Sequence, residues 1–369
     1  MFIDAMGLIL ADHTRANLGD LEEPRSLAAV PFAGRYRIID FTLSSLVNSG
    51  VKNVGVVANH KYRSLMDHLG TGAYWDLDRM QQGLSILPPF LISHHQDEQE
   101  GDLVGLYDFV RDATQNYVVI CESNQVMNID FGPYVQAAKA SGAKMTILYN
   151  QDGNKSGQPY FLLGLDEDNY VNDLFLSPRE LPTTNTALGI MILERDFLIQ
   201  HLELEVARGR NKLSVENLLR LYEEEQIFAL EYSGMILRIN SLATYFQASQ
   251  RFLEMDIFDL FFNQEDRPIY TKVKNEAPAM YLTGNKVVNS LLSDGCSVAG
   301  EVKDSIIFRG VQVGRHAVLD NCIIGQDCVI SEGAELSYVI LDKDTVIRPG
   351  VKLVGQPDYP VVIGKGVIV

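Results

Sequence analysis

The C-terminal part of the chain repeats small apolar residues at a spacing of six. From about Val287 onward, short Val/Ile segments alternate with Gly, Asp and Asn, and no helical periodicity is present. The repeated positions are Val311, Ala317, Ile323 and Val329 and, after a slip of one residue, Ala334, Ile340 and Val346. A period of six indicates a parallel β-helix, in which each short strand points one aliphatic side chain inward. Because the end of such a helix is open, we expect a neighbouring domain or a partner subunit to cap it.

The first part of the chain has a different pattern, in which short apolar runs alternate with helix-patterned stretches. The runs are GLIL, VGVVA, YVVIC and MTILY, and helical spacing is clearest in Tyr62–Leu69 and Pro133–Ala140. This alternation is typical of an α/β domain with a mostly parallel sheet. Ligands bind such sheets at the carboxyl ends of the strands, so we expect a site in the loops Ala11–Pro31 and Cys121–Asp130.

The middle of the chain is less regular. We expect strands at Tyr160–Leu165 and Ala187–Leu193, followed by a helical region at Asp196–Gln226. After Phe262 the stretch NQEDRPIYTKVKNEAP contains two prolines and many charges and is typical of a linker. We therefore predict an α/β domain over residues 1–262, a linker over 263–286 and a hexapeptide-repeat β-helix over 287–369.

Composition excludes several classes of function. The chain has 48 acidic and 31 basic residues, and its formal net charge of -17 opposes binding to nucleic acid or to an anionic membrane surface. No CxxC pair or histidine cluster is present, so we expect buried thiols rather than zinc or disulfides at Cys121, Cys296, Cys322 and Cys328. The first residues lack a basic leader and no stretch reaches membrane-spanning length, so we expect a cytoplasmic protein.

The stretch LAAVPFAGRYRIIDFTLSSLVNSG, residues 27–50, combines a loop with a helix. Pro31 and Gly34 restrict the backbone of the loop, and two arginines concentrate positive charge on it. Behind this loop, apolar residues at helical spacing predict a helix that is capped by Asp40 and ends at Gly50.

A nucleotide-binding α/β domain normally has glycines in its first loop, because backbone N–H groups must approach phosphate oxygens without a Cβ in the way. Here that loop reads DHTRANLGDLEEP. Its one glycine, Gly19, comes late, and the loop is acidic, with Asp12, Asp20, Glu22 and Glu23. These residues count against a phosphate-binding loop.

The run AVPFAGRYRIIDFTLSSLVNSG closely resembles the PFxGxYRxIDFxLSNxxNSG segment of bacterial glucose-1-phosphate adenylyltransferases. In that family a nucleotidyltransferase-type, Rossmann-like domain with a mostly parallel sheet is followed by a left-handed parallel β-helix of hexapeptide repeats. The resemblance therefore implies this fold for both domains. Downstream, YRSLMDHLGTGAYWDL is similar to the version found in the GlgD-type regulatory subunit.

The resemblance implies that the nucleotide site is degenerate. The family's first loop reads AGGxGTRL, and an ungapped match places Asp12, His13 and Arg15 where its glycines belong and Asn17 where its arginine belongs. The lysine of its KPAVPF segment falls on Leu27. In the family this arginine and lysine hold the triphosphate, so their replacement removes charges that stabilise the transition state.

The metal and sugar positions are altered as well. The family's LSGDHIYKMDY segment, which carries a metal-binding aspartate, is similar to CESNQVMNIDF, and the aspartate falls on Asn124. The second aspartate, in DVGT, falls on Arg238 or, with a shift of two, on Asn240; neither is acidic. The sugar-contacting EKP segment falls on Leu176, Ser177 and Pro178. We therefore expect no catalytic residue and no cofactor here, with Mg²⁺ required only in a catalytic partner.

Arg25, Arg35 and Arg37 cluster around the loop that Pro31 and Gly34 shape. In the family, basic residues at the Arg25 and Arg37 positions bind anionic allosteric effectors, so the resemblance implies a site for a phosphorylated metabolite. A structural salt-bridge role would explain the same arginines equally well.

The hypothesis that follows is a catalytically impaired, GlgD-like regulatory subunit of glucose-1-phosphate adenylyltransferase in glycogen synthesis. It would assemble with a catalytic subunit, as a tetramer in the family, and modulate the conversion of ATP and glucose 1-phosphate to ADP-glucose and pyrophosphate. One alternative is an active adenylyltransferase. Another is a hexapeptide-repeat acyltransferase with His316 as its base, which would leave the N-terminal motif unexplained. Trp75 and the histidines are interpreted as ordinary packing, surface or loop residues.

Overall fold

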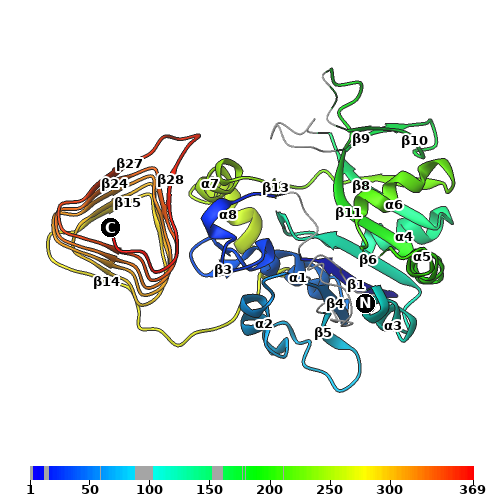
Figure 1. Cartoon of the computed structure of the whole chain (residues 1–369), viewed down its shortest axis with the longest axis horizontal. Coiled ribbons are helices and arrows are strands. Elements are labelled where there is room, and N and C mark those ends of the chain that lie inside the picture. Colours follow the sequence, from blue (N-terminus) through cyan, green and yellow to red (C-terminus); the bar gives the residue numbers. More distant parts are fainter. Residues whose placement is uncertain are drawn as a thin grey trace.

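The structure is a computed structural model that describes residues 3–11, 16–58, 60–87, 103–151, 161–176, 178, 180–210 and 212–369. Figure 1 shows its two parts, an α/β domain and a β-helix of triangular cross-section that lies beside it. This order confirms the predicted fold class, an α/β domain followed by a β-helix of hexapeptide repeats.

Nine strands of the described residues form one sheet in the α/β domain. Its main path is β10-β9-β11-β6-β1-β4-β5, and in addition β8 pairs with β11 and β12 with β8. β1 is parallel to β4 and β6, and β4 is parallel to β5, whereas β11 is antiparallel to β6 and β8. The strands are β1 (Ala5–Leu10), β4 (Asn53–Val57), β5 (Gly83–Leu87), β6 (Tyr117–Glu122), β8 (Met145–Asn150), β9 (Phe161–Leu165), β10 (Val171–Leu176), β11 (Thr186–Glu194) and β12 (Ile227–Glu231).

Helices cover both faces of this sheet, as a mostly parallel sheet requires. One face packs against α1 and α4 through residues such as Leu43 and Val135, and the other packs against α3 and α5 through Leu106 and Leu198. The helices are α1 (Ile38–Asn48), α2 (Arg63–Leu69), α3 (Leu103–Arg111), α4 (Gly132–Ser141), α5 (Arg195–Ala207), α6 (Val215–Leu219), α7 (Leu242–Arg251) and α8 (Met255–Phe262), with short 3₁₀ turns η1 (Gly19–Leu21), η2 (Leu27–Ala29), η3 (Ala73–Trp75) and η4 (Arg220–Glu223). Two small strand pairs complete the domain, β2 (Pro31–Phe32) with β3 (Tyr36–Arg37) and β7 (Gln125–Met127) with β13 (Ile236–Arg238).

The elements predicted from apolar periodicity are present. The four early runs lie in β1, β4, β6 and β8, the later strands are β9 and β11, and the helical patterns are α2 and α4. The predicted helical region Asp196–Gln226 contains two α-helices. α5 ends at Ala207, and Gly209, with a φ of 70°, separates it from α6.

The helix behind the arginine-rich loop begins earlier than predicted. α1 starts at Ile38, so Asp40 is its third residue and not its cap. The Oδ2 atom of Asp40 accepts a hydrogen bond of 2.9 Å from the backbone N–H of Arg37. A carboxylate at the third position can satisfy an unpaired donor at the helix start from inside the helix, which is why the predicted cap lies too far along the chain.

Three five-stranded parallel sheets form the three sides of the β-helix (Figure 1). Side chains such as Val298, Leu319 and Leu336 are buried inside it. The first sheet is β14 (Met280–Tyr281), β17 (Ser297–Val298), β20 (Gln312–Val313), β23 (Val329–Ile330) and β26 (Val346–Ile347). The second is β15 (Lys286–Val288), β18 (Glu301–Lys303), β21 (Val318–Asp320), β24 (Glu335–Ser337) and β27 (Lys352–Val354). The third is β16 (Leu291–Leu292), β19 (Ile306–Ile307), β22 (Ile323–Ile324), β25 (Val339–Leu341) and β28 (Val361–Ile363).

The register of the hexapeptide repeat differs from the predicted one. Val318 pairs with Glu335, so one coil spans 17 residues. Three strict hexapeptides would need eighteen residues. The one-residue slip that the sequence shows once therefore recurs along the helix. Ala317 lies inside the coil as predicted, whereas Ile323 and Ile340 belong to an apolar core between the two domains.

That apolar core joins the third sheet of the β-helix to the α/β domain. Leu18, Leu27 and Phe246 contribute to it from the α/β domain, and Ile306 and Phe308 contribute from the β-helix. Burial of large side chains from both sides is the main stabilising term for such a contact. The two domains therefore pack against each other along one side of the triangle.

The segment after α8 lies along α1. Asn48 Nδ2 donates a hydrogen bond of 2.9 Å to the Pro268 carbonyl, and the Tyr270 N–H donates one of 2.9 Å to Ser44 Oγ. The first β-helix strand, β14, lies inside the stretch predicted as linker, because its two residues already pair with β17. The division into residues 1–262, 263–286 and 287–369 otherwise remains a prediction.

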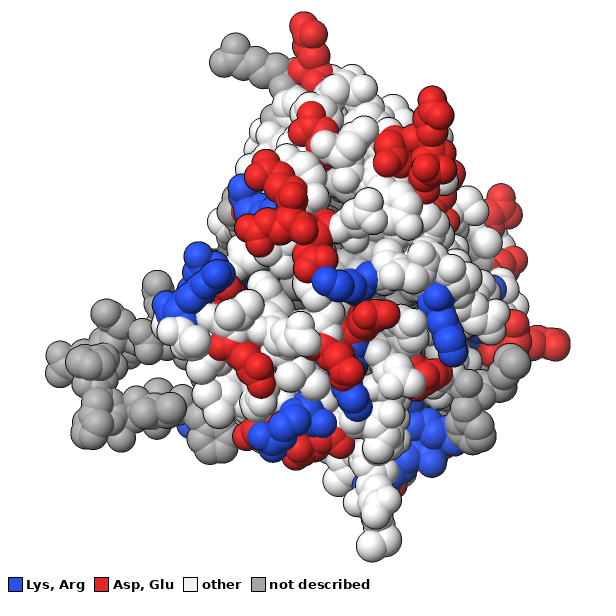
Figure 2. All heavy atoms as spheres, turned by 90° about the vertical axis from the view of Figure 1, so that its right-hand side faces the viewer, with Lys and Arg blue, Asp and Glu red and all other residues white. Residues whose placement is uncertain are grey.

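Acidic side chains gather on the upper part of the α/β-domain face that points away from the β-helix (Figure 2). Negative charge on that face repels a phosphate backbone. Within the described residues, none of the helices has the length and apolar character needed to cross a bilayer.

Candidate functional site

The carboxyl ends of β1, β4 and β6 meet at the edge of the sheet where the sequence predicts a degenerate nucleotide site. Asp12, His13 and Arg15 lie outside the described residues, and so does Ser177. Leu176 ends β10 with 44% of its surface exposed, so the described part of the sugar-contacting segment offers no charge.

Asn17 and Leu27, the positions of the family's two phosphate-holding cations, have structural contacts. Asn17 is exposed, and its Oδ1 accepts a hydrogen bond of 3.0 Å from the Gly19 N–H at the start of η1. Leu27 is 3% exposed and packs in the apolar core between the domains. Neither side chain presents positive charge to a phosphate.

Asn124 and Asn240 lie side by side at the end of β6. Asn124 Nδ2 donates a hydrogen bond of 2.6 Å to Asn240 Oδ1, and the Ile239 N–H donates one of 2.8 Å to the Asn124 carbonyl. Arg238 is on β13 opposite Gln125, and its guanidinium donates to the Ala187 carbonyl. Of the two candidate positions for the second metal-binding aspartate, the structure therefore brings Asn240 into contact with Asn124.

Glu122, at the carboxyl end of β6, is a site residue that the sequence did not single out. Burial raises its pKa to about 7, against the opposing charge of Arg238. A Cβ on Gly189, whose φ is 68°, would collide with the Glu122 carboxylate. The sequence signal that could have identified Glu122 was an acidic residue at the end of a predicted buried strand. Among the described residues, no three His, Cys, Asp or Glu side chains are placed to hold a metal ion.

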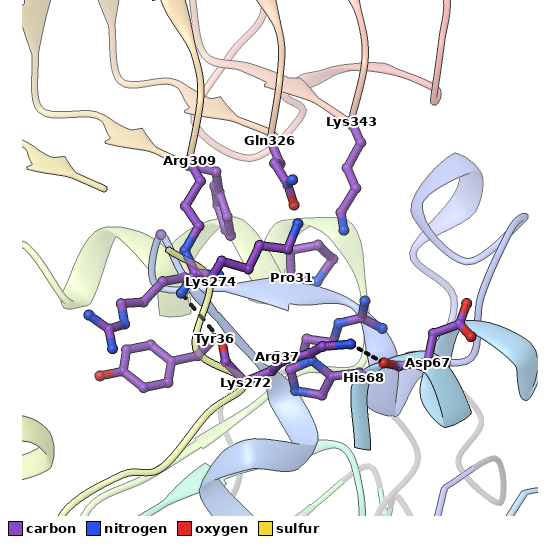
Figure 3. Close-up of a pocket in the computed structure, with 13 residues that line it drawn as sticks. Pro31, Tyr36, Arg37, Asp67, His68, Lys272, Lys274, Arg309, Gln326 and Lys343 are labelled. Atoms are coloured by element: carbon purple, nitrogen blue, oxygen red, sulfur yellow. Dashed lines mark hydrogen bonds between the residues drawn. The ribbon is translucent and has the colours of Figure 1, made fainter. Parts of the chain in front are cut away.

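A second site lies between the domains, and we call it the interdomain pocket (Figure 3). Its volume is about 220 Å³. The β2–β3 hairpin and α2 line it from the α/β domain, the segment after α8 adds two lysines, and the β-helix closes the opposite side. The lining residues are Pro31, Gly34, Arg35, Tyr36, Arg37, Asp67, His68, Lys272, Lys274, Phe308, Arg309, Gln326 and Lys343.

The turn of the β2–β3 hairpin lets the arginine-rich loop approach the β-helix. Ala33 and Gly34 have φ values of 47° and 81°. A Cβ on Gly34 would lie 2.8 Å from Ser293 Oγ in the β-helix, so only glycine combines this conformation with this approach. The turn thereby places Arg35 and Arg37 at the domain boundary.

Positive charge dominates the lining of the interdomain pocket. Six of the lining residues are Lys or Arg, and Asp67 is the one carboxylate among them. Burial lowers the pKa of Arg37 to about 10 and that of Lys343 to about 8, and it also lowers the pKa of Arg309. Such shifts arise where cations are crowded and desolvated, which is the condition that a bound anion would relieve.

The predicted Arg35 and Arg37 both line this pocket. Arg37 Nη1 donates to the carbonyl and the hydroxyl of Ser64, at 2.6 and 2.9 Å, and these bonds fix its guanidinium. The Arg35 guanidinium lies over the Tyr36 ring, 5.5 Å from its centroid. Neither arginine forms an ion pair with a described residue, so both charges remain available to a ligand.

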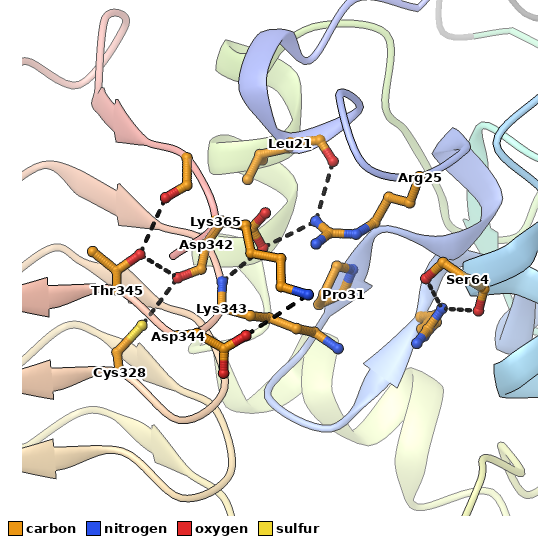
Figure 4. A network of polar contacts seen from close by, with 12 residues as sticks. Leu21, Arg25, Pro31, Ser64, Cys328, Asp342, Lys343, Asp344, Thr345 and Lys365 are labelled. Atoms are coloured by element: carbon orange, nitrogen blue, oxygen red, sulfur yellow. Dashed lines mark hydrogen bonds and ion pairs between the residues drawn. The ribbon is translucent and has the colours of Figure 1, made fainter. Parts of the chain in front are cut away.

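Arg25 is placed differently. It is 3% exposed and lies outside the pocket lining, with its Nη1 2.9 Å from Asp342 Oδ1 and 3.1 Å from the Leu21 carbonyl. Figure 4 shows this pair joining the loop before η2 to the turn after β25. The structure therefore gives Arg25 the salt bridge that was the alternative for these arginines.

His68 connects the pocket to α1. Its Nε2 lies 2.5 Å from Asp40 Oδ1, and both side chains are buried. Burial lowers the pKa of His68, while Asp40 acts to raise it. Trp75, the one tryptophan of the chain, packs against His68 with ring centroids 5.8 Å apart and is 1% exposed, which confirms it as a packing residue.

Two family models match the chain. A nucleotidyl transferase model covers residues 7–234, and a GlmU-like C-terminal hexapeptide model covers residues 278–358. The chain is also 33% identical to the glycogen biosynthesis protein GlgD of Bacillus subtilis (strain 168), over 98% of its own length and 96% of that protein. The chain belongs to the GlgD group of the nucleotidyl transferase family.

Glucose-1-phosphate adenylyltransferases are similar to the GlgD-like chain as well. The protein of Thermosipho africanus is 29% identical over 86% of the chain and 78% of its own length. The protein of Bacillus thuringiensis is 28% identical over 93% and 94% respectively. The similarity extends through both domains, which confirms the resemblance found in the sequence.

Proposed function

We propose that the GlgD-like chain is a catalytically impaired regulatory subunit that assembles with a catalytic glucose-1-phosphate adenylyltransferase subunit. The contact between Asn124 and Asn240 carries this proposal. Adenylyl transfer from ATP to glucose 1-phosphate develops negative charge on pyrophosphate, and a divalent cation held by carboxylates offsets that charge. Two amides that bond to each other contribute no negative charge to hold the cation.

The phosphate side of the site supports the same conclusion. Leu27 is buried in the core between the domains, and Asn17 bonds to the turn that follows it. A clamp for a triphosphate needs fixed positive charge where the charge develops. Instead of positive charge, the site carries the carboxylate of Glu122 at the end of β6. Metal binding and phosphate binding would therefore be lost together.

A chain with this fold and little activity of its own would act in the cytoplasm through a partner. We propose a hetero-oligomer, a tetramer, with the catalytic subunit. The first two sheets of the β-helix keep exposed apolar residues, such as Met280 and Val288, that could pack on a like module. The third sheet is already covered by the chain's own α/β domain.

We also propose that the interdomain pocket binds a phosphorylated metabolite and transmits its binding to the complex. Arg35 and Arg37 would contact the phosphate together with cations from the β-helix. Arg25 would contribute indirectly, because its pair with Asp342 fixes the turn that carries Lys343. A ligand between two domains can favour one arrangement of them over another, and that difference is the source of regulation.

The test compares the chain alone, a catalytic homologue alone and the co-expressed pair. We expect the chain alone to release negligible pyrophosphate from ATP and glucose 1-phosphate, and the pair to elute as one active particle of tetramer mass. Sugar phosphates should shift the activation curve of the pair. Turnover by the highly purified chain at the rate of the homologue would contradict the impairment, and separation of the two chains by size exclusion would contradict the assembly.

A further inference from the structure

Another pocket of the α/β domain lies at the end of α1, whereas the interdomain pocket lies at the start of that helix. Its volume is about 280 Å³. The end of α1, the η3 turn and the segment after α8 line it. We call it the aromatic pocket, and its lining includes Asn48, Tyr74, Trp75, Asp76, Arg79 and Tyr270.

Three aromatic side chains shape the aromatic pocket. Tyr74 and Tyr270 are 42% and 38% exposed, and Trp75 is 1% exposed. Tyr74 packs edge-on against Trp75, with ring centroids 6.3 Å apart, and its hydroxyl donates a hydrogen bond of 3.4 Å to the Val273 carbonyl. Tyr270 is held through its backbone, because its N–H donates to Ser44 Oγ at 2.9 Å. The two tyrosines therefore offer partly exposed aromatic surface at positions that their neighbours fix.

The polar groups of the aromatic pocket carry little free charge. Arg79 donates to both the carbonyl and the carboxylate of Asp76, and Lys52, the other cation of the lining, has an interaction as well. Asn48 Nδ2 already donates to a backbone carbonyl, which leaves its Oδ1 as an acceptor. The indole N–H of Trp75 is buried and has no hydrogen-bond partner among the described residues. An ion would have to separate Arg79 from Asp76, whereas a hydroxyl group can hydrogen-bond to either of them while the pair persists.

We propose that the aromatic pocket binds an uncharged sugar ring, the end of a glucan chain. A sugar ring presents C–H groups on its faces, which pack against aromatic rings such as those of Tyr74 and Tyr270. Its hydroxyls lie around the ring, where Asn48 and Asp76 supply acceptors and Trp75 supplies a donor. Pockets for small molecules combine aromatic surface with a few placed polar groups in this way.

The choice of a glucan rests on the proposed function. A catalytic partner would make ADP-glucose, in which the glucosyl group is bonded to a phosphate leaving group. The class of reaction that consumes such a product is transfer of the glucosyl group to a hydroxyl of an acceptor sugar, with release of the nucleotide. A subunit that holds the acceptor chain would keep the product near the place where it is used.

The volume of the aromatic pocket limits how much of the chain is bound. About 280 Å³ is just below the roughly 300 Å³ at which pockets for drug-sized ligands begin. One or two rings fit this volume, and the other units of a glucan would stay in solvent. Binding of so few rings is weak, so we expect a dissociation constant roughly in the millimolar range. Several such pockets in one oligomer would raise the apparent affinity for a branched particle with many chain ends.

The test titrates the full-length chain with maltoheptaose and follows the fluorescence of Trp75, its one tryptophan. We expect a saturable change with maltoheptaose and none with sorbitol, a polyol without a ring. Tyr270→Ala should weaken binding about tenfold, and Tyr270→Phe, which keeps the aromatic ring, should bind like the wild type. The backbone bond to Ser44 does not use the ring, so both variants should fold, which circular dichroism checks. Tyr359→Ala, at a β-helix position that is 79% exposed, is the matched control and should leave the affinity unchanged.

Absence of a saturable change with maltoheptaose would overturn this inference, and so would equal affinities of the wild type and Tyr270→Ala. Saturation by adenosine but not by maltoheptaose would show that the pocket takes a nucleobase instead. Neither result affects the proposed function, because assembly with the catalytic subunit and pyrophosphate release are measured separately. Conversely, a chain that binds maltoheptaose but separates from the catalytic subunit would keep the sugar site and contradict the proposed assembly.

Discussion

Arg25 and Asp342 form a buried ion pair that joins the α/β domain to the β-helix, with 2.9 Å between Nη1 and Oδ1. Their side chains are 4% and 1% exposed, and Asp342 Oδ2 has no hydrogen-bond partner among the described residues. Removal of either residue would leave a buried charge without its counter-ion. The pair therefore holds the domains together at the edge of the interdomain pocket.

We expect Arg25→Ala to lower the free energy of unfolding by about 3–5 kcal/mol, the usual cost of breaking a buried pair from one side. The double variant Arg25→Met/Asp342→Leu, which replaces both charges by apolar side chains, should be much closer to the wild type. Urea denaturation measures the free energy of unfolding of the single and of the double variant. As a control, Arg251→Ala removes a half-exposed pair with Glu254 and should cost less than about 1 kcal/mol. Equal losses of unfolding free energy in Arg25→Ala and in Arg251→Ala would contradict the role of Arg25.

The contact between Asn124 and Asn240 predicts the effect of restoring carboxylates. In Asn124→Asp/Asn240→Asp, two adjacent negative charges should lower the Tm in the absence of metal, and Mn²⁺ should raise it again by binding the folded state. Thermal unfolding against MnCl₂ concentration measures this effect. The matched variant Asn124→Ala/Asn240→Ala should show no dependence on Mn²⁺, and a similar dependence there would show that the ion binds elsewhere.

The same carboxylate variant should remain inactive. Leu27 and Asn17 would still lack the charges that hold a triphosphate, and residues of one catalytic site do not contribute independently. The single change Asn124→Asp should be inactive for the same reason. Pyrophosphate release by either variant, measured against the wild type, would show that the first loop binds nucleotide in spite of its sequence.

Glu122 should make stability depend on pH. Its pKa rises from 4.5 to about 7 on folding, so the folded state holds the proton more tightly and the stability is lost as the pH rises through 7. Glu122→Gln removes this titration, so its stability relative to the wild type should be greater at pH 8 than at pH 5, by at most on the order of 3 kcal/mol. Glu265→Gln, at an exposed acid, is the control and should show no such difference.

Sequence patterns predicted the elements of this fold because they follow local rules. β1, β4 and β6 are buried on both faces, and a strand in that position must be a continuous apolar run. The hexapeptide spacing likewise predicted the β-helix. Its exact register was not predicted, because the coil from Val318 to Glu335 is one residue shorter than three hexapeptides, and this changes which residue faces inward.

The interdomain pocket could not be predicted in the same way. Lys272 lies in the segment after α8, and Arg309 and Lys343 lie in turns of the β-helix. Nothing in the sequence connects these cations to Arg37 before the two domains dock. The role of Arg25 depends on Asp342, 317 residues further along the chain. Long-range pairing of isolated charges leaves no periodic signal, so only the three-dimensional arrangement distinguishes a ligand-binding arginine from a structural one.

Arg37 is the arginine whose loss should weaken effector binding most. Its guanidinium is fixed by Ser64 and sufficiently buried that its pKa falls to about 10, so a phosphate contact there would be well desolvated. Loss of such a charged contact costs about 1.5–3 kcal/mol, or roughly a 10- to 150-fold weaker effector affinity. Arg35 is exposed, so Arg35→Ala should have a smaller effect.

The measurement requires each variant in this subunit alone, assembled with an unaltered catalytic subunit and titrated with sugar phosphates. Arg315→Ala, at an exposed position of the β-helix, is the control and should leave the activation curve unchanged. Because linkage is reciprocal, an effector that activates through Arg37 must bind the active arrangement of the complex more tightly than the inactive one. If the Arg37→Ala complex assembles normally and keeps the wild-type activation curve, Arg37 has only a structural role through Ser64, and the effector binds elsewhere.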